Sequence, residues 1–245
     1  MASIVATSKE LFWAEVEQTT AIYLPDSPVI VREKLVHANA KCLQMEIFRT
    51  CTGITPFAQR IFSSLPISSL PISSPPMKVL DLGAGNGAYT LQMASSGAHV
   101  TAIDQSREFL VVIATKSAEI GCPSENLRLR RGDITTMESY DGPFNLVVAM
   151  DILPYVPPTK LRSTMEKIQQ CLEDRGILIG TLFTTESLHP LVQELQEKAG
   201  AHFYKNSSEF ITQLLEHSGF TVLELEEREE GGFSFKAEKA PVEKN

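Results

Sequence analysis

Residues 78–90 read KVLDLGAGNGAYT, an apolar run that stops at three glycines on alternate positions. Gly83, Gly85 and Gly87 can adopt positive φ angles, and they leave main-chain N–H groups open to a ligand because no Cβ stands in the way. A helix-compatible segment, residues 88–95, follows directly. A buried strand, a glycine turn and a helix in this order are typical of a phosphate or nucleoside cradle, but a plain strand-to-helix turn has the same pattern. The rest of the chain decides between the two.

Strand-like and helix-like patterns alternate from residue 77 onward. Strands are expected at 79–82, 99–104, 127–131, 144–150 and 176–183, and helices at 90–96, 107–120 and 159–172. Near the end, a helix at 208–218 precedes strands at 219–225 and 233–237, and their glycine-bearing connection predicts a hairpin with one reversed strand. The pattern predicts an α/β fold, a Rossmann-like, doubly wound, seven-stranded, mostly parallel sheet with an antiparallel C-terminal hairpin strand.

The chain before residue 77 has a different character. Amphipathic patterns predict helices at 8–22, 31–51 and 55–62. Two copies of Ser-Leu-Pro-Ile-Ser at 64–73 and two further prolines follow, and prolines at this density favour extended chain. We therefore expect an N-terminal helical lid or cap (1–62), a Pro/Ser-rich linker (63–76) and a main domain (77–245). The alternative to a lid is a set of helices packed on the flank of the main domain.

Charge and composition exclude several classes of function. The chain has 245 residues and a net charge of −8, which disfavours broad nucleic-acid binding. No apolar run approaches the ~18 residues of a membrane span, and no secretory signal is visible. The four cysteines are scattered, which favours free thiols over disulfides or a metal site. We expect a cytoplasmic protein with no metal and no nucleic-acid or membrane partner.

Four features fall at the ends of the expected parallel strands, where open parallel sheets bind ligands. The first is the glycine turn after Leu82. The second is Asp104, whose carboxylate can accept hydrogen bonds from both hydroxyls of a ribose. The third is the segment 132–134, where a side chain can meet the amino edge of an adenine. The fourth, residues 150–151, lies beside the expected reacting centre. Asp104 and Asp133 could each instead cap the segment that follows.

Two nucleoside cofactors fit this arrangement. A nicotinamide dinucleotide is supported by residues 83–88, which also satisfy G-x-G-x-x-A. Asp81 opposes it, because a carboxylate inside the first strand is better suited to an amino group, as in the methionine part of S-adenosylmethionine (SAM). The reversed C-terminal hairpin also opposes a regular dinucleotide fold.

Residues 78–183 and 207–237 resemble the class I SAM-dependent methyltransferases, and the small-molecule members of that family are nearest in layout. The matching motifs are VLDLGAGNG at 79–87, AIDQS at 102–106, RGDI at 131–134, FNLVV at 144–148, LEDRGIL at 172–178 and HSGF at 217–220. The resemblance implies that Asp104 holds the ribose, that Gln105 lies against the adenine and that Asp133 binds the adenine amino group. The implied cofactor-binding residues are Asp81, Gly83, Ala84, Gly85, Gly87, Asp104, Gln105, Asp133, Ile134 and Met150.

The chain departs from the family pattern at three places. Asn145 stands where the family usually has Asp, and Pro154 and Tyr155 stand where many small-molecule members have histidine. The tetrapeptide Asn/Asp-Pro-Pro-aromatic, found in enzymes that methylate nucleobase or glutamine nitrogens, is absent. The last departure disfavours those two substrate classes.

The implied reaction is an in-line displacement at the sulfonium methyl, in which the protein aligns a small-molecule nucleophile and excludes water. A general base is needed only for a poorly acidic acceptor, and the candidates are Asp151, Tyr155 and His37. Each has a plainer interpretation: a loop cap or cofactor-supporting group for Asp151, packing for Tyr155 and a solvated helix position for His37. Two functions remain as alternatives, a nicotinamide-dependent oxidoreductase and a non-catalytic scaffold whose N-terminal helices bind a protein.

Overall fold

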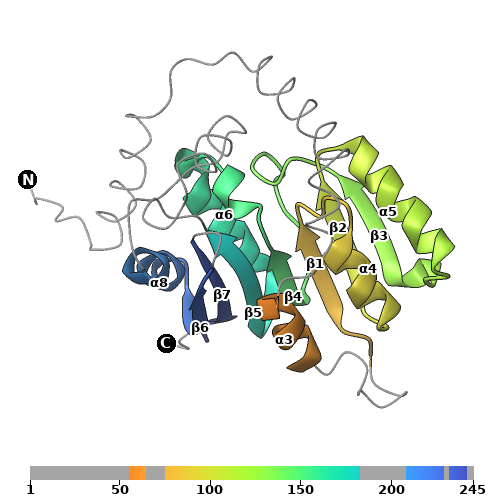
Figure 1. The fold of residues 1–245 in the computed structure, drawn as a ribbon. Helices are drawn as coiled ribbons and strands as arrows, with labels where there is room; N and C mark the ends of the chain where they lie inside the picture. Colours follow the sequence, from red (N-terminus) through yellow and green to blue (C-terminus); the bar gives the residue numbers. More distant parts are fainter. Residues whose placement is uncertain (1–55, 65–74, 183–207, 229–231, 242–245) are drawn as a thin grey trace, which may run out of the picture.

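The computed structural model describes residues 56–64, 75–182, 208–228 and 232–241, and Figure 1 shows their fold. The expected helices at 8–22 and 31–51 lie outside these residues, as does the linker repeat apart from its first residue, Ser64. The elements in chain order are α3 (Pro56–Ser64), β1 (Lys78–Leu82), α4 (Ala88–Ser95), β2 (His99–Asp104), α5 (Arg107–Glu119), η3 (Ser124–Asn126), β3 (Leu127–Arg131), β4 (Phe144–Ala149), η4 (Leu153–Tyr155), α6 (Pro158–Cys171), β5 (Leu172–Leu182), α8 (Ser208–His217), β6 (Phe220–Glu227) and β7 (Phe233–Lys239).

The strands form one seven-stranded sheet in the order β3-β2-β1-β4-β5-β7-β6. Strands β1 to β5 pair in parallel, whereas β7 runs antiparallel to both of its neighbours, β5 and β6. The expected Rossmann-like sheet and its reversed hairpin strand are therefore confirmed. The strand order reverses between β1 and β4, so a ligand-binding crevice is expected at their carboxyl ends.

Alternate side chains of each strand enter different hydrophobic clusters on the two faces of the sheet. Leu80 and Leu82 of β1 pack with side chains of α6 and α8, whereas Val79 packs with α3 and α4. Helix α5 contributes Ile113 to a smaller cluster with Ala84 and Ala102. Helices on both faces bury the central strands and leave the carboxyl ends of these strands, with the loops that follow them, to form the site.

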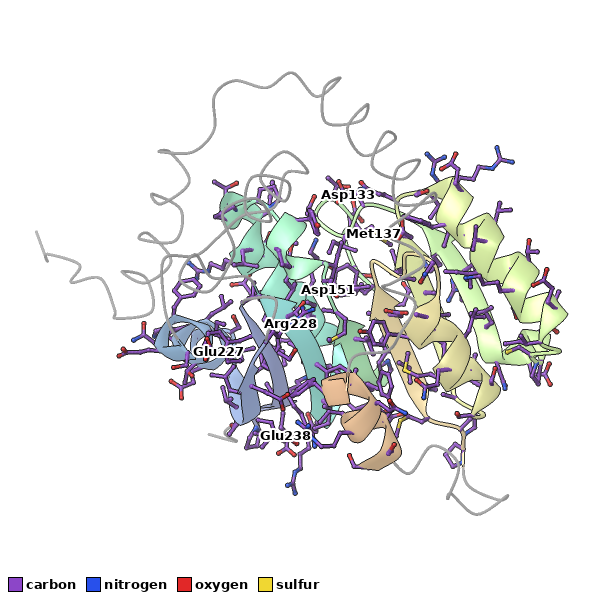
Figure 2. All side chains as sticks on the ribbon, viewed as in Figure 1. Asp133, Met137, Asp151, Glu227, Arg228 and Glu238 are labelled. Atoms are coloured by element: carbon purple, nitrogen blue, oxygen red, sulfur yellow. The ribbon has the colours of Figure 1, made fainter. Side chains whose placement is uncertain are left out.

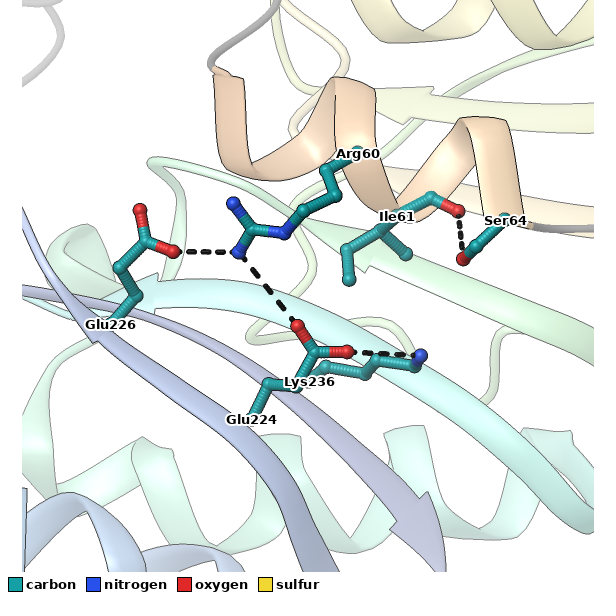
Figure 3. Close-up of polar contacts among 6 residues, drawn as sticks. All are labelled: Arg60, Ile61, Ser64, Glu224, Glu226 and Lys236. Atoms are coloured by element: carbon teal, nitrogen blue, oxygen red, sulfur yellow. Dashed lines mark hydrogen bonds and ion pairs between the residues drawn. The ribbon is translucent and has the colours of Figure 1, made fainter.

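Helix α3 is part of this packing, although the sequence pattern placed it in the N-terminal segment. Phe57, Ile61 and Phe62 are buried in the same cluster as Val79 and Val148. Arg60 on the outer side donates a hydrogen bond of 2.6 Å to Glu226, and its guanidinium is 3.7 Å from Glu224 (Figure 3). The helix is thus fixed to the sheet mainly by buried apolar area, since exposed ion pairs stabilise little. The division of the chain at residues 62 and 76 stays a prediction.

Shortening Ile61 tests how α3 is held. Ile61→Val should lower the free energy of unfolding by about 1 kcal/mol, the usual effect of removing one buried methyl group. Arg60→Gln, in the neighbouring position, should change the free energy of unfolding much less because the Arg60 side chain is 54% exposed. Urea denaturation of the two variants makes the comparison. A larger loss in Arg60→Gln would show that the ion pairs dominate the docking of α3.

Strand β5 begins earlier than the pattern predicts. Leu172 already pairs with Phe144, and regular pairing resumes between Ile177 and Leu146 after a shift of register. Arg175 takes a positive φ of 61° in the intervening bulge. Three charged residues in this bulge, 173–175, hid the start of the strand in the sequence.

Among the described residues, no helix is both long and apolar enough to span a membrane.

Candidate cofactor-binding site

The glycine turn leaves β1 and is fixed to the end of β2. The N–H groups of Gly83 and Ala84 both donate to the carbonyl oxygen of Ile103, at 2.8 and 3.1 Å. Gly83 has φ of +69°, and a Cβ there would lie 2.5 Å from Cγ1 of Ile152. The first glycine is therefore required for packing of the turn against the loop after β4.

Gly85 differs from Gly83 in what surrounds it. It also has a positive φ, +53°, but a Cβ at this position would meet nothing closer than the Gly83 carbonyl oxygen at 3.8 Å. Gly87, with φ of +83°, is the N-cap residue before α4, and a Cβ there would lie 2.7 Å from Ile113. The middle glycine thus has open space in front of it, whereas its neighbours are needed for the protein's own packing.

Asp104 ends β2 directly beside this turn. Its Oδ2 accepts a hydrogen bond of 2.8 Å from the N–H of Gly85, and its Oδ1 accepts one of 2.8 Å from the N–H of Ser106. Burial raises the pKa of Asp104, and these backbone hydrogen bonds lower it. An ionised carboxylate has about four lone-pair sites, so each oxygen can accept a further bond from a ligand hydroxyl. Asp104 therefore combines a capping role with the capacity to bind a diol.

Asp81 lies beneath the turn and is 2% exposed. Its Oδ2 accepts a short hydrogen bond from the Thr90 hydroxyl on α4. Burial raises the pKa of Asp81 to about 7, an effect that the Thr90 hydrogen bond partly offsets and that the nearby Asp104 charge increases. A carboxyl group with a pKa near neutral pH is readily shifted to its ionised form by a nearby cation.

Asp133 begins the loop after β3. Its Oδ1 accepts hydrogen bonds of 2.8 Å from both the N–H and the hydroxyl of Thr135. Its carbonyl oxygen accepts from the N–H groups of Thr136 and Met137, at 3.1 and 3.0 Å. The residue thus caps a tight turn, which is the plainer role considered for it, and the same turn fixes the direction of its carboxylate. In Figure 2, Asp133 and Met137 lie at the upper end of the sheet and Glu238 lies at its lower end.

Met150 is buried at the end of β4, and Asp151 follows it with a positive φ of 55°. The N–H of Asp151 donates to the Thr181 hydroxyl at 2.6 Å, and that hydroxyl donates back to Oδ1 at 3.1 Å. Arg228, which follows β6, forms a short ion pair with the same Oδ1 (Figure 2). Asp151 therefore links the ends of β4, β5 and β6. This structural role stands beside its predicted role as a candidate base.

Tyr155 ends η4, close to Asp151. Burial, and secondarily the charge of Asp151, raise the pKa of Tyr155 to about 12. The phenol is therefore protonated over the whole neutral range, which suits a hydrogen-bond donor rather than a general base.

A pH titration of tyrosine absorbance tests this state. Tyr155→Phe should leave the ionisation step of the wild-type protein unchanged up to about pH 10.5, because an unperturbed tyrosine ionises near pH 10 and Tyr155 does not. If Tyr155→Phe clearly reduces the tyrosine ionisation seen below pH 10.5, the raised pKa of Tyr155 is contradicted.

The structure brings most of the predicted residues to one edge of the sheet. Gly83, Ala84, Gly85 and Gly87 form the turn, and Asp81, Asp104, Gln105, Asp133, Ile134, Met150 and Asp151 lie at or beyond the ends of β1 to β4. Gln105 is exposed, whereas Ile134 is buried against the core. His37 and the proposed lid lie outside the described residues. The binding and catalytic roles of all these residues stay predictions.

Four residues of the site were not found by sequence reasoning. Thr90 supports Asp81, Thr181 and Arg228 support Asp151, and Lys167 contacts the loop after Asp133. Thr90 could have been noticed, because it is a polar residue in the first turn of the helix that follows the glycines. The other three reach the site from elements far away in the sequence, and no local spacing indicates them.

Comparisons with known proteins agree with this geometry. A family profile described as a methyltransferase domain matches residues 79–176. The chain is 33% identical over 100 residues to the chloroplastic magnesium protoporphyrin IX methyltransferase of Arabidopsis thaliana. The aligned region covers 41% of this chain and 31% of that protein. It is 36% identical over 80 residues to a ubiquinone biosynthesis O-methyltransferase of Chromobacterium violaceum, covering 33% of this chain and 34% of the other. These matches span about a third of each relative's own length.

A solved structure shows the same fold. The magnesium protoporphyrin IX methyltransferase of Synechocystis PCC 6803 with bound SAH superposes with a TM-score of 0.60, covering 85% of this chain and all of that one at 16% identity. The strand order and the glycine turn are those that the resemblance to class I methyltransferases predicts, and the profile match lies over the same strands. The described residues therefore share the fold of a solved methyltransferase, and residues 79–176 are the part of the chain that matches a methyltransferase domain.

Proposed function

We propose that this protein is a SAM-dependent methyltransferase that transfers a methyl group to a small-molecule acceptor. The main support is the juxtaposition of Gly85 and Asp104 at the carboxyl ends of β1 and β2. The open space at Gly85 lies next to a buried carboxylate whose two oxygens are each held by one backbone N–H. This arrangement presents a bidentate acceptor to a ligand, as a ribose diol requires.

The residues present fit SAM at three further points. Asp133 is held in one orientation by its own turn and would bind the amino edge of adenine. Asp81 lies beneath the glycine turn and would respond to the positively charged amino group of the methionine part. Met150 and Asp151 follow the strand on the other side of the crevice, where the acceptor would meet the methyl group.

When bound, SAM supplies a methyl group that the adjacent positive sulfur makes electrophilic. The protein then has to hold the nucleoside, align the acceptor and exclude water. The contacts of Asp151 with Thr181 and Arg228 join the ends of three strands. They would hold the backbone in place on the side where the acceptor binds. Tyr155 would donate a hydrogen bond to the acceptor, since its pKa of about 12 keeps the proton in place.

A small-molecule acceptor is supported by what similar proteins are named for. The two curated relatives are named for magnesium protoporphyrin IX and for ubiquinone biosynthesis, neither of which is a protein or nucleic acid. The net charge of −8 also disfavours a nucleic-acid acceptor. We further propose a cytoplasmic location, which is supported by the free thiols of Cys122 and Cys171.

Calorimetric titration with SAM and, separately, with NADH tests the proposal. We expect SAM to bind at one site with micromolar affinity or tighter, and NADH to show no heat of binding. Binding of NADH alone would favour the oxidoreductase. If SAM binds, transfer of its labelled methyl group to a panel of hydroxylated and carboxylated small molecules distinguishes an enzyme from a scaffold, which would bind SAM without transferring the methyl group.

A further inference from the structure

Lys167 reaches from α6 to the loop that follows β3. Its ammonium group donates to the carbonyl oxygens of Ile134 and Met137, both at 2.9 Å, and to that of Thr135 at 3.4 Å. A lysine ammonium has three donors, so these three carbonyls use all of them. The three acceptors belong to the turn that Asp133 begins, and a single side chain therefore binds the exit of that turn.

Tyr140 completes the same arrangement from the other end of the loop. Its buried hydroxyl donates to the Ile134 carbonyl oxygen at 2.7 Å, and the Lys167 ammonium lies 5.3 Å from the centre of its ring. The Ile134 carbonyl thus accepts one hydrogen bond from each side chain. Gly132 adds a steric limit, because a Cβ there would lie 2.5 Å from the sulfur of Met137.

Asp133 is attached directly to this clamped turn. Both the Asp133 carbonyl and its Oδ1 accept hydrogen bonds from residues 135–137. A change in the path of residues 134–137 would therefore rotate the carboxylate. Burial lowers the pKa of Lys167, and the nearby charge of Asp133 raises it, so the two groups interact electrostatically as well.

We propose that Lys167 is a positioning residue that orients Asp133 for recognition of the adenine amino group. The proposal rests on the proposed function, because it assigns adenine to the loop after β3. Lys167 acts through the backbone of residues 134–137 rather than through contact with the nucleoside. Removing its donors is expected to reduce discrimination at the base and not to weaken binding of the whole ligand uniformly.

The test compares two ligands that differ at one position of the base. S-adenosylhomocysteine carries the amino group, and S-inosylhomocysteine carries a carbonyl oxygen there, which a carboxylate repels. Wild-type protein should bind the adenine ligand about a hundredfold more tightly, since a hydrogen bond to a charged group is replaced by a repulsion. Lys167→Met should reduce this ratio about tenfold, mainly through weaker binding of S-adenosylhomocysteine. Lys78→Met, which removes the same charge from an exposed position at the start of β1, is the matched control and should leave the ratio unchanged.

The possible outcomes separate the two proposals. Equal weakening of both ligands in Lys167→Met, or an unchanged ratio, would refute the positioning role while the proposed function stands. Failure of the wild-type protein to bind S-adenosylhomocysteine would refute both. If circular dichroism shows that Lys167→Met does not fold, Tyr140→Phe is measured in the same way, because it removes a single donor to Ile134. A severalfold lower ratio in that variant supports the clamp, and an unchanged ratio overturns it.

Discussion

Asp104→Ala should weaken SAM binding by at least about a hundredfold in a calorimetric titration. A hydrogen bond to a charged group contributes about 1.5–3 kcal/mol, and a ribose would make two of them with this carboxylate. The alanine variant also leaves the N–H groups of Gly85 and Ser106 without their acceptors, so the glycine turn loses one of its anchors to β2. Both effects act in the same direction on affinity.

Two variants separate these effects. Asp104→Asn keeps the shape of the side chain but replaces one acceptor oxygen by a donor, and it should lose less affinity than Asp104→Ala. Glu138→Ala removes one negative charge from an exposed position in the loop after β3, and it should bind SAM as the wild type does. Near-normal affinity in Asp104→Ala would mean that this carboxylate does not hold the ribose.

Asp81→Asn should stabilise the protein at alkaline pH by up to about 4 kcal/mol. Burial raises the pKa of Asp81 from 3.8 to about 7, and each pKa unit corresponds to about 1.36 kcal/mol. Between these two values the folded protein holds a proton that the unfolded chain has lost, so its stability falls as the pH rises and then becomes constant above about pH 7. Asparagine can still accept the hydrogen bond from Thr90 but carries no charge to desolvate.

Urea denaturation from about pH 4.5 to pH 8.5 measures this difference. The gap between Asp81→Asn and the wild type should be small at the acid end and largest at the alkaline end. Asp174→Asn, which changes an exposed carboxylate, should show no comparable gap. Equal stability of wild type and Asp81→Asn at alkaline pH would show that Asp81 ionises without an energetic cost.

The same substitution should have the opposite effect on ligand binding. A bound ammonium group would favour ionised Asp81, and asparagine cannot supply that attraction. We therefore expect Asp81→Asn to be more stable than the wild type and to bind SAM less tightly. Such a combination is typical of a binding site that retains a destabilising group for function.

The sheet could be predicted from the sequence because its signals are local. The glycine turn after β1 and the apolar strands of β2 and β4 each stand within a few residues of a clear boundary. Parallel strands then place Asp104, Asp133 and Asp151 at one edge without further information. The start of β5 was missed because a bulge of charged residues does not resemble a strand.

The supporting contacts of the site could not be predicted. Arg228 lies 77 positions after Asp151, and Lys167 lies 33 after Ile134, so the pairs meet only once the sheet and α6 are in place. The sequence showed Arg228 as part of a charged turn and Lys167 as one of several polar residues of a helix. The near-neutral pKa of Asp81 likewise depends on burial beneath the glycine turn, which no motif specifies.

The two halves of the site have different kinds of support. On the proposed nucleoside side, the carboxylates of Asp104 and Asp133 accept hydrogen bonds mainly from backbone N–H groups. On the proposed acceptor side, the side chains of Thr181 and Arg228, from the ends of β5 and β6, hold Asp151. Under the proposed function, a site built this way can keep its cofactor contacts while its acceptor contacts vary.

A crystal structure of the wild-type protein with S-adenosylhomocysteine tests the central claim most directly. We predict that both ribose hydroxyl oxygens lie within about 3 Å of the Asp104 carboxylate, with the adenine amino group beside Asp133 and the ligand sulfur facing residues 150–151. A ligand bound elsewhere, or one whose ribose does not contact Asp104, would contradict the account.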